Sequence, residues 1–172
     1  MSERNVELLR RWIEVFNERD IETLIGMCDP AIELRSVFAA VGGGVYYGHD
    51  GMRRWHRDLQ EAWGEQIRLQ PEAYFDLGEH MLMFFVYHGR GEHSGAEVAT
   101  PATSVAQWRD GLLTHSTVYL DRAQALRDLG VTEDALTVEL VVLVRLDAEP
   151  LPRARPATKS LTRRSHTLPP AR

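Results

Sequence analysis

The sequence predicts an α+β fold in which three N-terminal helices close one face of a curved antiparallel sheet to form a cone. Two observations support this prediction. Apolar residues recur at helical spacing in residues 5–16, 21–25 and 51–63, whereas four later runs between residues 67 and 120 are strand-like. A further strand falls between the second and third helices. Helix, helix, strand, helix and then an antiparallel meander is the order of a cone-shaped α+β roll.

The first two helices are expected within residues 5–25. Asn5 to Phe16 forms one apolar stripe on a helix, with Trp12 beside it and charged residues facing water. The stripe consists of Val6, Leu9, Ile13 and Phe16. After a polar turn, Asp20 is a good N-cap for a second helix that buries Leu24 and Ile25.

The next part of the chain supplies a strand and the third helix. After Pro30, residues Ala31 to Ser36 read as a strand. Residues 41–45, Val-Gly-Gly-Gly-Val, are expected to form a loop, and it is no phosphate cradle because no Gly-Lys-Ser/Thr follows. Asp50 is predicted to cap a helix from Gly51 to about Trp63, which the following glycine ends.

The strand-like runs are separated by segments that carry turn residues. They are Ile67 to Leu77, Met81 to Arg90, Glu97 to Trp108 and Leu112 to Leu120. Between the last two, Arg109-Asp110-Gly111 is a strong hairpin signal. Asp121 to Leu129 predicts a last short helix that ends at Gly130. The run Val138 to Leu146 is rich enough in β-branched residues to form one more strand, but the predicted order of helices and strands does not show where this strand would lie.

Three segments are expected along the chain: a domain at residues 1–130, an extension at 131–149 with one extra strand, and a basic tail at 150–172. Residues 1–149 hold 14 Lys and Arg and all 25 Asp and Glu, a balance of −11, whereas the tail holds six basic residues and no acidic one. The tail is poor in large apolar residues, so it is expected to be disordered. An acidic body argues against nucleic-acid binding, which needs a basic face.

Cysteine content and hydropathy exclude further classes of site and location. One cysteine, Cys28, allows no intrachain disulfide and gives no metal signature, and its apolar setting predicts an inert buried thiol. No metal and no cofactor are expected. The first residues lack the apolar core of a secretory signal, and the longest apolar run, Met81 to Tyr87, is too short to cross a bilayer. A cytoplasmic protein that does not contact a membrane is therefore expected.

Three stretches resemble SnoaL-like domains of the nuclear-transport-factor-two-like superfamily: FNERDIETLIGMCDPAIELRS, VYYGHDGMRRWHRDLQEAW and WRDGLLTHSTVYLDRAQAL. The resemblance covers roughly residues 3–130 and rests on Phe-Asn before an acidic turn, Asp-Pro, Tyr-x-Gly-x-x-Gly, Arg-Asp-Gly and Tyr-Leu-Asp-Arg. This branch is similar to ketosteroid isomerase and the polyketide cyclases. It implies the cone fold, whereas its functions range from isomerases, cyclases and hydrolases to non-catalytic ligand binders.

The resemblance implies an apolar ligand pocket between the helices and the concave face of the sheet. Strand alternation and the family pattern together select the side chains that face it. The set consists of Trp12, Phe16, Arg35, Trp55, Ser104, Trp108, Ser116 and Val118. Ala106 shares the strand face of Ser104. Arg35 has a fixed charge, so it is expected to orient a polar or anionic end of the ligand.

The catalytic groups of characterised relatives have no counterpart at the matching positions. Ketosteroid isomerase uses an aspartate base and an oxyanion hole made of a tyrosine and a protonated aspartate. The resemblance matches the tyrosine with Trp12 and places the base at or near Arg35. It places the protonated aspartate at Thr103 or Ser104, and the acid/base aspartate of the polyketide cyclases at Val118. Neither catalytic set is present.

Two classes of function remain open. The missing aspartates favour the first, a pocket protein that binds a small, mostly apolar ligand with weak catalysis or none. The second is an isomerase, polyketide-cyclase-like or hydrolase enzyme with non-standard acid/base residues, for which the candidates are His56, Glu33 and Asp121.

A homodimer is the expected assembly. His115, Thr117 and Tyr119 alternate with the pocket-facing residues of the last strand, which places them on the outer face of the sheet. The resemblance implies that this face forms the dimer interface. An antiparallel sheet with one covered face often uses the other for a partner.

Overall fold

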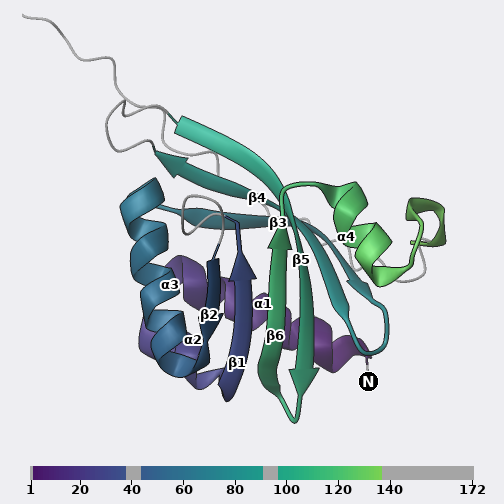
Figure 1. Ribbon diagram of the computed structural model, residues 1–172, viewed down its shortest axis with the longest axis horizontal. Helices are drawn as coiled ribbons and strands as arrows, with labels where there is room; N and C mark the ends of the chain where they lie inside the picture. Colours follow the sequence, from purple (N-terminus) through teal and green to yellow (C-terminus); the bar gives the residue numbers. More distant parts are fainter. Residues whose placement is uncertain (1, 38–43, 91–96, 137–172) are drawn as a thin grey trace, which may run out of the picture.

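Helices and strands account for most of the residues that the structure describes (Figure 1). The computed structural model describes residues 2–37, 44–90 and 97–136. The helices are α1 (Ser2–Glu18), α2 (Ile21–Gly26), α3 (Gly48–Trp63) and α4 (Arg122–Leu129), followed by a 3-10 helix at Glu133–Ala135. The strands are β1 (Cys28–Ser36), β2 (Gly44–Tyr47), β3 (Arg68–Asp76), β4 (Met81–Arg90), β5 (Glu97–Arg109) and β6 (Leu112–Tyr119).

The strands form one six-stranded sheet in the order β2-β1-β6-β5-β4-β3. Neighbouring strands are antiparallel except β1 and β6, which run parallel with Leu34 opposite Ser116. The parallel pair arises because α3 carries the chain from β2 at one edge to β3 at the other, so that the meander from β3 to β6 returns beside β1. The predicted α+β fold is confirmed, with one parallel pair in an otherwise antiparallel sheet.

Helices lie on both faces of this sheet. On the inner face, α1, α2 and α3 enclose the main hydrophobic core, to which the sheet contributes side chains such as Leu34, Phe85 and Val118. On the outer face, Leu126 of α4 packs in a second cluster with Phe84. Figure 1 shows α4 in front of the sheet and α1 behind it. The three N-terminal helices therefore close the inner face as predicted, and α4 covers part of the outer face.

The Tyr-x-Gly-x-x-Gly motif joins β2 to α3. Tyr46 is buried, and its hydroxyl donates to Oδ2 of Asp58 at 3.0 Å, which links the strand to the helix. Gly48 has a φ of 64°, a conformation that favours glycine. A Cβ atom at Gly51 would lie 2.9 Å from the backbone of Tyr46, so only glycine permits this close approach. The motif thereby sets how α3 lies across the inner face.

Two local predictions near this junction are wrong. The expected loop at residues 41–45 ends earlier than predicted, because β2 already begins at Gly44. The N-cap residue of α3 is Tyr47, so Asp50 lies in the first helical turn rather than at the cap. An acidic side chain in the first turn still interacts favourably with the helix dipole.

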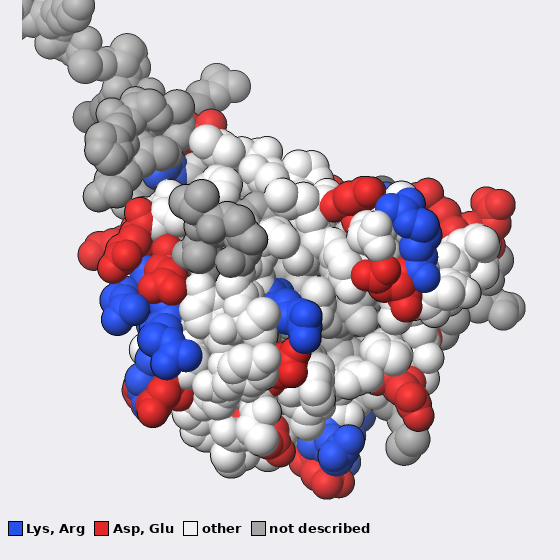
Figure 2. All heavy atoms as spheres, in the orientation of Figure 1, with Lys and Arg blue, Asp and Glu red and all other residues white. Residues whose placement is uncertain are grey.

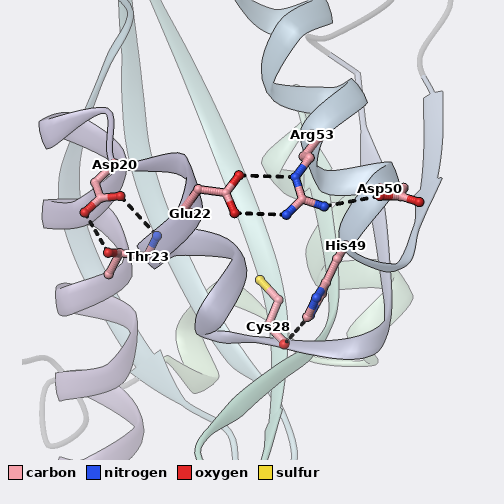
Figure 3. A network of polar contacts seen from close by, with 7 residues as sticks. All are labelled: Asp20, Glu22, Thr23, Cys28, His49, Asp50 and Arg53. Carbon is pink, nitrogen blue, oxygen red and sulfur yellow. Dashed lines mark hydrogen bonds and ion pairs between the residues drawn. The ribbon is translucent and has the colours of Figure 1, made fainter.

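Polar contacts on the surface hold α2 against α3 (Figure 3). The predicted N-cap Asp20 is confirmed, because its carboxylate accepts from the backbone N–H and the hydroxyl of Thr23 at 3.1 and 2.6 Å. Arg53 on α3 donates to Glu22 through Nε and Nη2 at 3.2 and 2.9 Å, and to Asp50 through Nη1. Exposed ion pairs of this kind contribute about 1 kcal/mol or less, so this link between α2 and α3 adds little to stability.

The predicted ends of α4 are confirmed. Asp121 accepts from the backbone N–H of Ala123 at 2.9 Å, and Gly130 ends the helix in the left-handed region. Val131 and Leu136 then pack against the outer-face cluster. No helix within the described ranges is long and apolar enough to span a membrane.

Two predictions concern residues outside the described ranges. These are the strand expected at Val138 to Leu146 and the basic tail at 150–172. Of the extension at 131–149, only residues 131–136 are described, and they contain the 3-10 helix.

Candidate functional site

A small cavity lies between the inner face of the sheet and helices α1 and α3; we call it the interior cavity. Its volume is about 20 Å³, which is room for about one water molecule. It is lined by Leu9, Trp12, Leu34, Trp55, Leu69, Met83, Phe85, Tyr87, Ser104, Ala106, Leu113, Ser116 and Val118. Aliphatic and aromatic side chains dominate this wall, and its polar groups are hydroxyls and indole N–H groups.

Three aromatic rings pack together beside the interior cavity. The ring centroids of Trp12 and Phe16 lie 5.8 Å apart and are stacked, while Trp55 lies 6.0 Å from Trp12 and 5.8 Å from Phe16. Trp12 and Trp55 line the cavity, and Phe16 packs against both without lining it. Each such ring pair contributes about 0.5–1.5 kcal/mol beyond burial, so the cluster joins α1 firmly to α3.

Two serine hydroxyls meet in the cavity wall. Ser104 on β5 and Ser116 on β6 are buried, and their Oγ atoms lie 3.3 Å apart. Ser104 lies opposite Val118 in the pairing of β5 with β6, and Ser116 lies opposite Ala106. Because Val118 and Ala106 also line the cavity, the two serine side chains lie on the inner face of the sheet.

Trp12, Trp55 and Trp108 each have a buried indole N–H without a hydrogen-bond partner. The N–H of Trp12 faces the sulfur of Cys28 and partly offsets the rise that burial causes in the pKa of this thiol. The contact does not have the geometry of an ordinary hydrogen bond. The N–H of Trp55 meets no acceptor among the described residues. A buried donor left unpaired costs about 1–3 kcal/mol, so an acceptor that enters the cavity and reaches the Trp55 N–H would be favoured.

Burial holds the titratable groups near the interior cavity in their neutral forms. Desolvation raises the pKa of Cys28 to about 11, and its Sγ–H donates to the carbonyl of Leu24 at 3.4 Å. Burial also raises the pKa of the Tyr87 hydroxyl well above its ordinary value. Neither group is ionised at neutral pH, so neither supplies a base there.

The described lining of the interior cavity contains no Asp, Glu, His, Lys or Arg. Acid/base catalysis at neutral pH depends on side chains of these kinds placed within hydrogen-bond reach of the substrate. The described wall therefore lacks the carboxylate, imidazole and amine groups that acid/base catalysis most often uses. Across the described ranges, no group of three or more His, Cys, Asp or Glu side chains is arranged to hold a metal ion.

Five of the predicted pocket residues come together at the interior cavity: Trp12, Trp55, Ser104, Ser116 and Val118. Phe16 packs behind two of them in the aromatic cluster. Trp108 is half-buried against the main core, after a register shift in β5, and does not line the cavity.

Arg35 lies on the outer face of the sheet. The buried residues of β1 include Ile32, Leu34 and Ser36, so Glu33 and Arg35 point the opposite way. The Nε of Arg35 donates to Oε1 of Glu33 at 2.7 Å, and the Arg35 side chain is 57% exposed. The prediction that Arg35 faces the pocket is wrong, because a shift of one residue along a strand reverses the face. Leu34 occupies the cavity wall instead.

Sequence reasoning missed the contribution of β4 to the cavity. Met83, Phe85 and Tyr87 line it, whereas the intervening Phe84 belongs to the outer-face cluster. Because helices cover both faces of this strand, its residues are apolar almost throughout, and alternation gave no sign of which face meets the cavity.

The three candidate catalytic residues do not meet at the interior cavity. Glu33 is ion-paired on the outer face. His56 is half-buried on α3, where desolvation lowers its pKa. Asp121 caps α4 on the outer side of the sheet by accepting from Ala123. None of the three lines the described cavity wall.

A larger groove of about 240 Å³ lies on the outer face, with wall residues from the sheet and from α4; we call it the outer groove. It is lined by Glu33, Arg35, His80, Val105, Gln107, His115, Thr117, Tyr119, Asp128 and Leu129. Desolvation and a hydrogen bond to Asp128 raise the pKa of Tyr119. Figure 2 shows that charged side chains gather over α3, over α4 and at the lower edge, while the surface between them is mainly uncharged apart from a small group near its centre.

Solved structures share this fold over nearly their whole length. A protein of the NTF2-like class and unknown function from Burkholderia pseudomallei K96243 has a TM-score of 0.62 and 20% identity, covering 72% of this chain and 95% of that chain. TerC, co-crystallised with polyporic acid, has a TM-score of 0.62 and 22% identity, covering 73% and 97%. A protein with a ketosteroid isomerase-like fold from Catenulispora acidiphila DSM 44928, in complex with trimethylamine, has a TM-score of 0.59 and 16% identity, covering 74% and 95%. At these identities the likeness shows the fold alone.

No curated protein matches the sequence. The family model of the SnoaL-like domain matches residues 9–116, which is more than half of the chain. The matched residues include every lining residue of the interior cavity except Val118. The chain therefore belongs to the SnoaL-like domain family.

Proposed function

We propose that this protein binds a small, mostly apolar molecule in the interior cavity and does not catalyse proton transfer there. The observation that carries the proposal is the composition of the cavity wall. It combines aromatic and aliphatic side chains with a few hydroxyl and N–H groups, and its described residues include no charged side chain. Sites for small molecules typically have this composition, with a few polar groups that orient the ligand.

The ligand has to enlarge the cavity when it enters. The volume of about 20 Å³ suits one water molecule, whereas sites for drug-sized ligands measure roughly 300–1,000 Å³. Met83 in the wall is unbranched and adaptable, so it is the side chain best suited to move aside. Small ligands are therefore favoured, and binding should be accompanied by rearrangement of the wall.

Two of the similar structures contain a small molecule, polyporic acid with TerC and trimethylamine with the Catenulispora acidiphila protein. For this chain they support only the idea that a fold of this shape accommodates a small molecule. The identity of the ligand has to come from the residues of this chain.

A pair of alanines on β5 provides the test, with cyclopentanone as the probe. Ala106 lines the interior cavity, whereas Ala102 is also buried on the same strand without lining it. Ala106→Leu should fill the cavity and weaken binding about tenfold or more, and Ala102→Leu should change it by less than about twofold. Affinity is measured by NMR titration, and circular dichroism checks that both variants are folded. Absence of saturable binding to the parent, or equal weakening by both changes, would refute the proposal.

A second candidate function is catalysis in the outer groove, in keeping with an isomerase, polyketide-cyclase-like or hydrolase activity. The observation that favours it is the presence of Glu33, His80, His115 and Tyr119 in one groove, since these side chains can transfer protons. The ion pair with Arg35 weighs against Glu33 as a base, because it stabilises the carboxylate. If an activity is found, its loss in Glu33→Gln would support this alternative, whereas the binding proposal expects no activity that depends on Glu33.

A further inference from the structure

We infer that the interior cavity selects a neutral ligand that carries a hydrogen-bond acceptor, such as a carbonyl or ether oxygen, on a small apolar body. The recognising groups are the indole N–H of Trp55 and the hydroxyl pair of Ser104 and Ser116. This inference rests on the proposed function, because it names the chemical class of ligand for the same site.

Trp55 contributes a hydrogen-bond donor that the protein leaves unpaired. Its side chain lies on α3, lines the interior cavity and is only 1% exposed. Its Nε1 atom is buried without a hydrogen-bond partner in the described chain. Indole N–H is a donor only, so it can be satisfied by an acceptor and by nothing else. An oxygen of the ligand would remove the cost of this buried donor.

The other two unpaired indoles do not compete for this role. The N–H of Trp12 faces the Cys28 sulfur, which is a weak acceptor. Trp108 has an equally unpaired and buried N–H, but it does not line the interior cavity. Trp108 therefore offers a matched control for Trp55, with the same chemical group in the same state outside the site.

The serine pair adds a second donor. Two hydroxyl groups carry two protons, and the hydrogen bond between Ser104 and Ser116, with the oxygens 3.3 Å apart, uses one of them. The other proton remains for an acceptor. Because both residues line the interior cavity, a ligand oxygen that enters it has hydroxyl donors in the wall as well as the indole.

The absence of charge in the described wall excludes ionic ligands. No Lys, Arg or His lines the interior cavity to pair with an anion, and no Asp or Glu lines it to pair with a cation. Moving an unpaired ion from water into such a wall carries a large desolvation penalty. A pure hydrocarbon would avoid that penalty but would leave the Trp55 donor unpaired. A neutral acceptor on an apolar body satisfies both conditions.

The test compares three probes of similar shape: cyclopentanone, methylenecyclopentane, which replaces the carbonyl oxygen by a CH₂ group, and cyclopentanecarboxylate. Titrations are followed by ¹H–¹⁵N NMR of the four indole N–H groups in the intact chain. Cyclopentanone should bind roughly fivefold to tenfold more tightly than methylenecyclopentane, as one net hydrogen bond predicts, and the carboxylate should not bind. The indole proton of Trp55 should move downfield with the ketone and not with the hydrocarbon.

Trp55→Phe keeps an aromatic ring and removes the donor. It should reduce the affinity for cyclopentanone to that for methylenecyclopentane, while Trp108→Phe should preserve the difference between the probes. If Trp55→Phe does not fold, the indole shift in the parent protein decides the matter. Equal affinity for ketone and hydrocarbon, with no shift of the Trp55 indole, would overturn the inference and leave the proposed apolar site standing. Failure of all three probes to bind would overturn both.

Discussion

The side chain of Asn17 makes two hydrogen bonds with the main chain of Leu69. Nδ2 of Asn17 donates to the Leu69 carbonyl and the Leu69 N–H donates to Oδ1 of Asn17, each at 2.9 Å. Asn17 lies near the end of α1, and Leu69 belongs to β3 at the edge of the described sheet. The amide group thus takes the place of a neighbouring strand and fastens α1 over the interior cavity. This contact gives a physical role to the Phe-Asn pair in the family motif.

Asn17→Ala should destabilise the protein by about 1–3 kcal/mol, because it leaves a partly buried N–H and carbonyl of Leu69 without partners. Asn5→Ala on the same helix is the matched control and should change stability by about 0.5 kcal/mol or less. Urea unfolding of both variants gives the two free energies. A loss for Asn17→Ala no larger than that of the control would show that the two hydrogen bonds do not fasten the helix.

The sequence predicted the helices and strands where hydrophobic periodicity was clear. The stripe that contains Leu9 and Ile13 lies in the main core, and β4 spans Met81–Arg90 as expected. Capping chemistry at Asp20 and Gly130 was equally readable, because it depends on local geometry. These features follow from neighbouring residues alone.

Features that depend on distant contacts were not predictable in the same way. Arg35 and Leu34 are adjacent, and only the pairing of β1 with β6 decides which one faces the interior cavity. The packing of Leu126 on the outer face could not be read from the short helix that carries it. The small size of the cavity depends on side-chain packing and has no sequence signal.

His56 should make stability depend on pH. Desolvation on α3 lowers its pKa in the folded state, whereas the unfolded chain has the ordinary value of about 6.5. As the pH falls below about 6.5, the unfolded state takes up the proton first, so the folded state loses stability until the pH has passed the lowered pKa. The parent should therefore lose more stability between pH 7 and pH 5 than His56→Gln does. Urea midpoints measure this, and an identical pH dependence in both proteins would exclude the effect.

We propose that a homodimer forms through the part of the outer face that α4 leaves open. Val45 and Tyr47 on β2 are 42% and 59% exposed, and they pair with Arg35 and Glu33 on β1. Apolar and aromatic side chains such as these are typical of an interface centre, where charged residues are depleted. The surface over these strands is also mainly uncharged (Figure 2).

Val45→Glu should convert the dimer to a monomer, because it places an added carboxylate in the proposed contact, opposite Arg35, whose guanidinium is already paired with Glu33. Val98→Glu is the matched control, since Val98 is 36% exposed on β5, and it should leave the dimer intact. Light scattering at micromolar concentration gives the masses of all three proteins. A monomeric parent would remove the proposal, as would a dimer that survives the change at Val45.

The location of the bound ligand tests the central claim most directly. Methyl NMR resonances of Leu34 and Val118, which line the interior cavity, are compared during a cyclopentanone titration with those of Leu126 in the outer-face cluster and Leu129 in the outer groove. We predict saturable shifts at Leu34 and Val118 and none at Leu126 or Leu129. Shifts confined to Leu129, or the absence of saturable shifts at any of these methyl groups, would contradict a ligand site inside the cone.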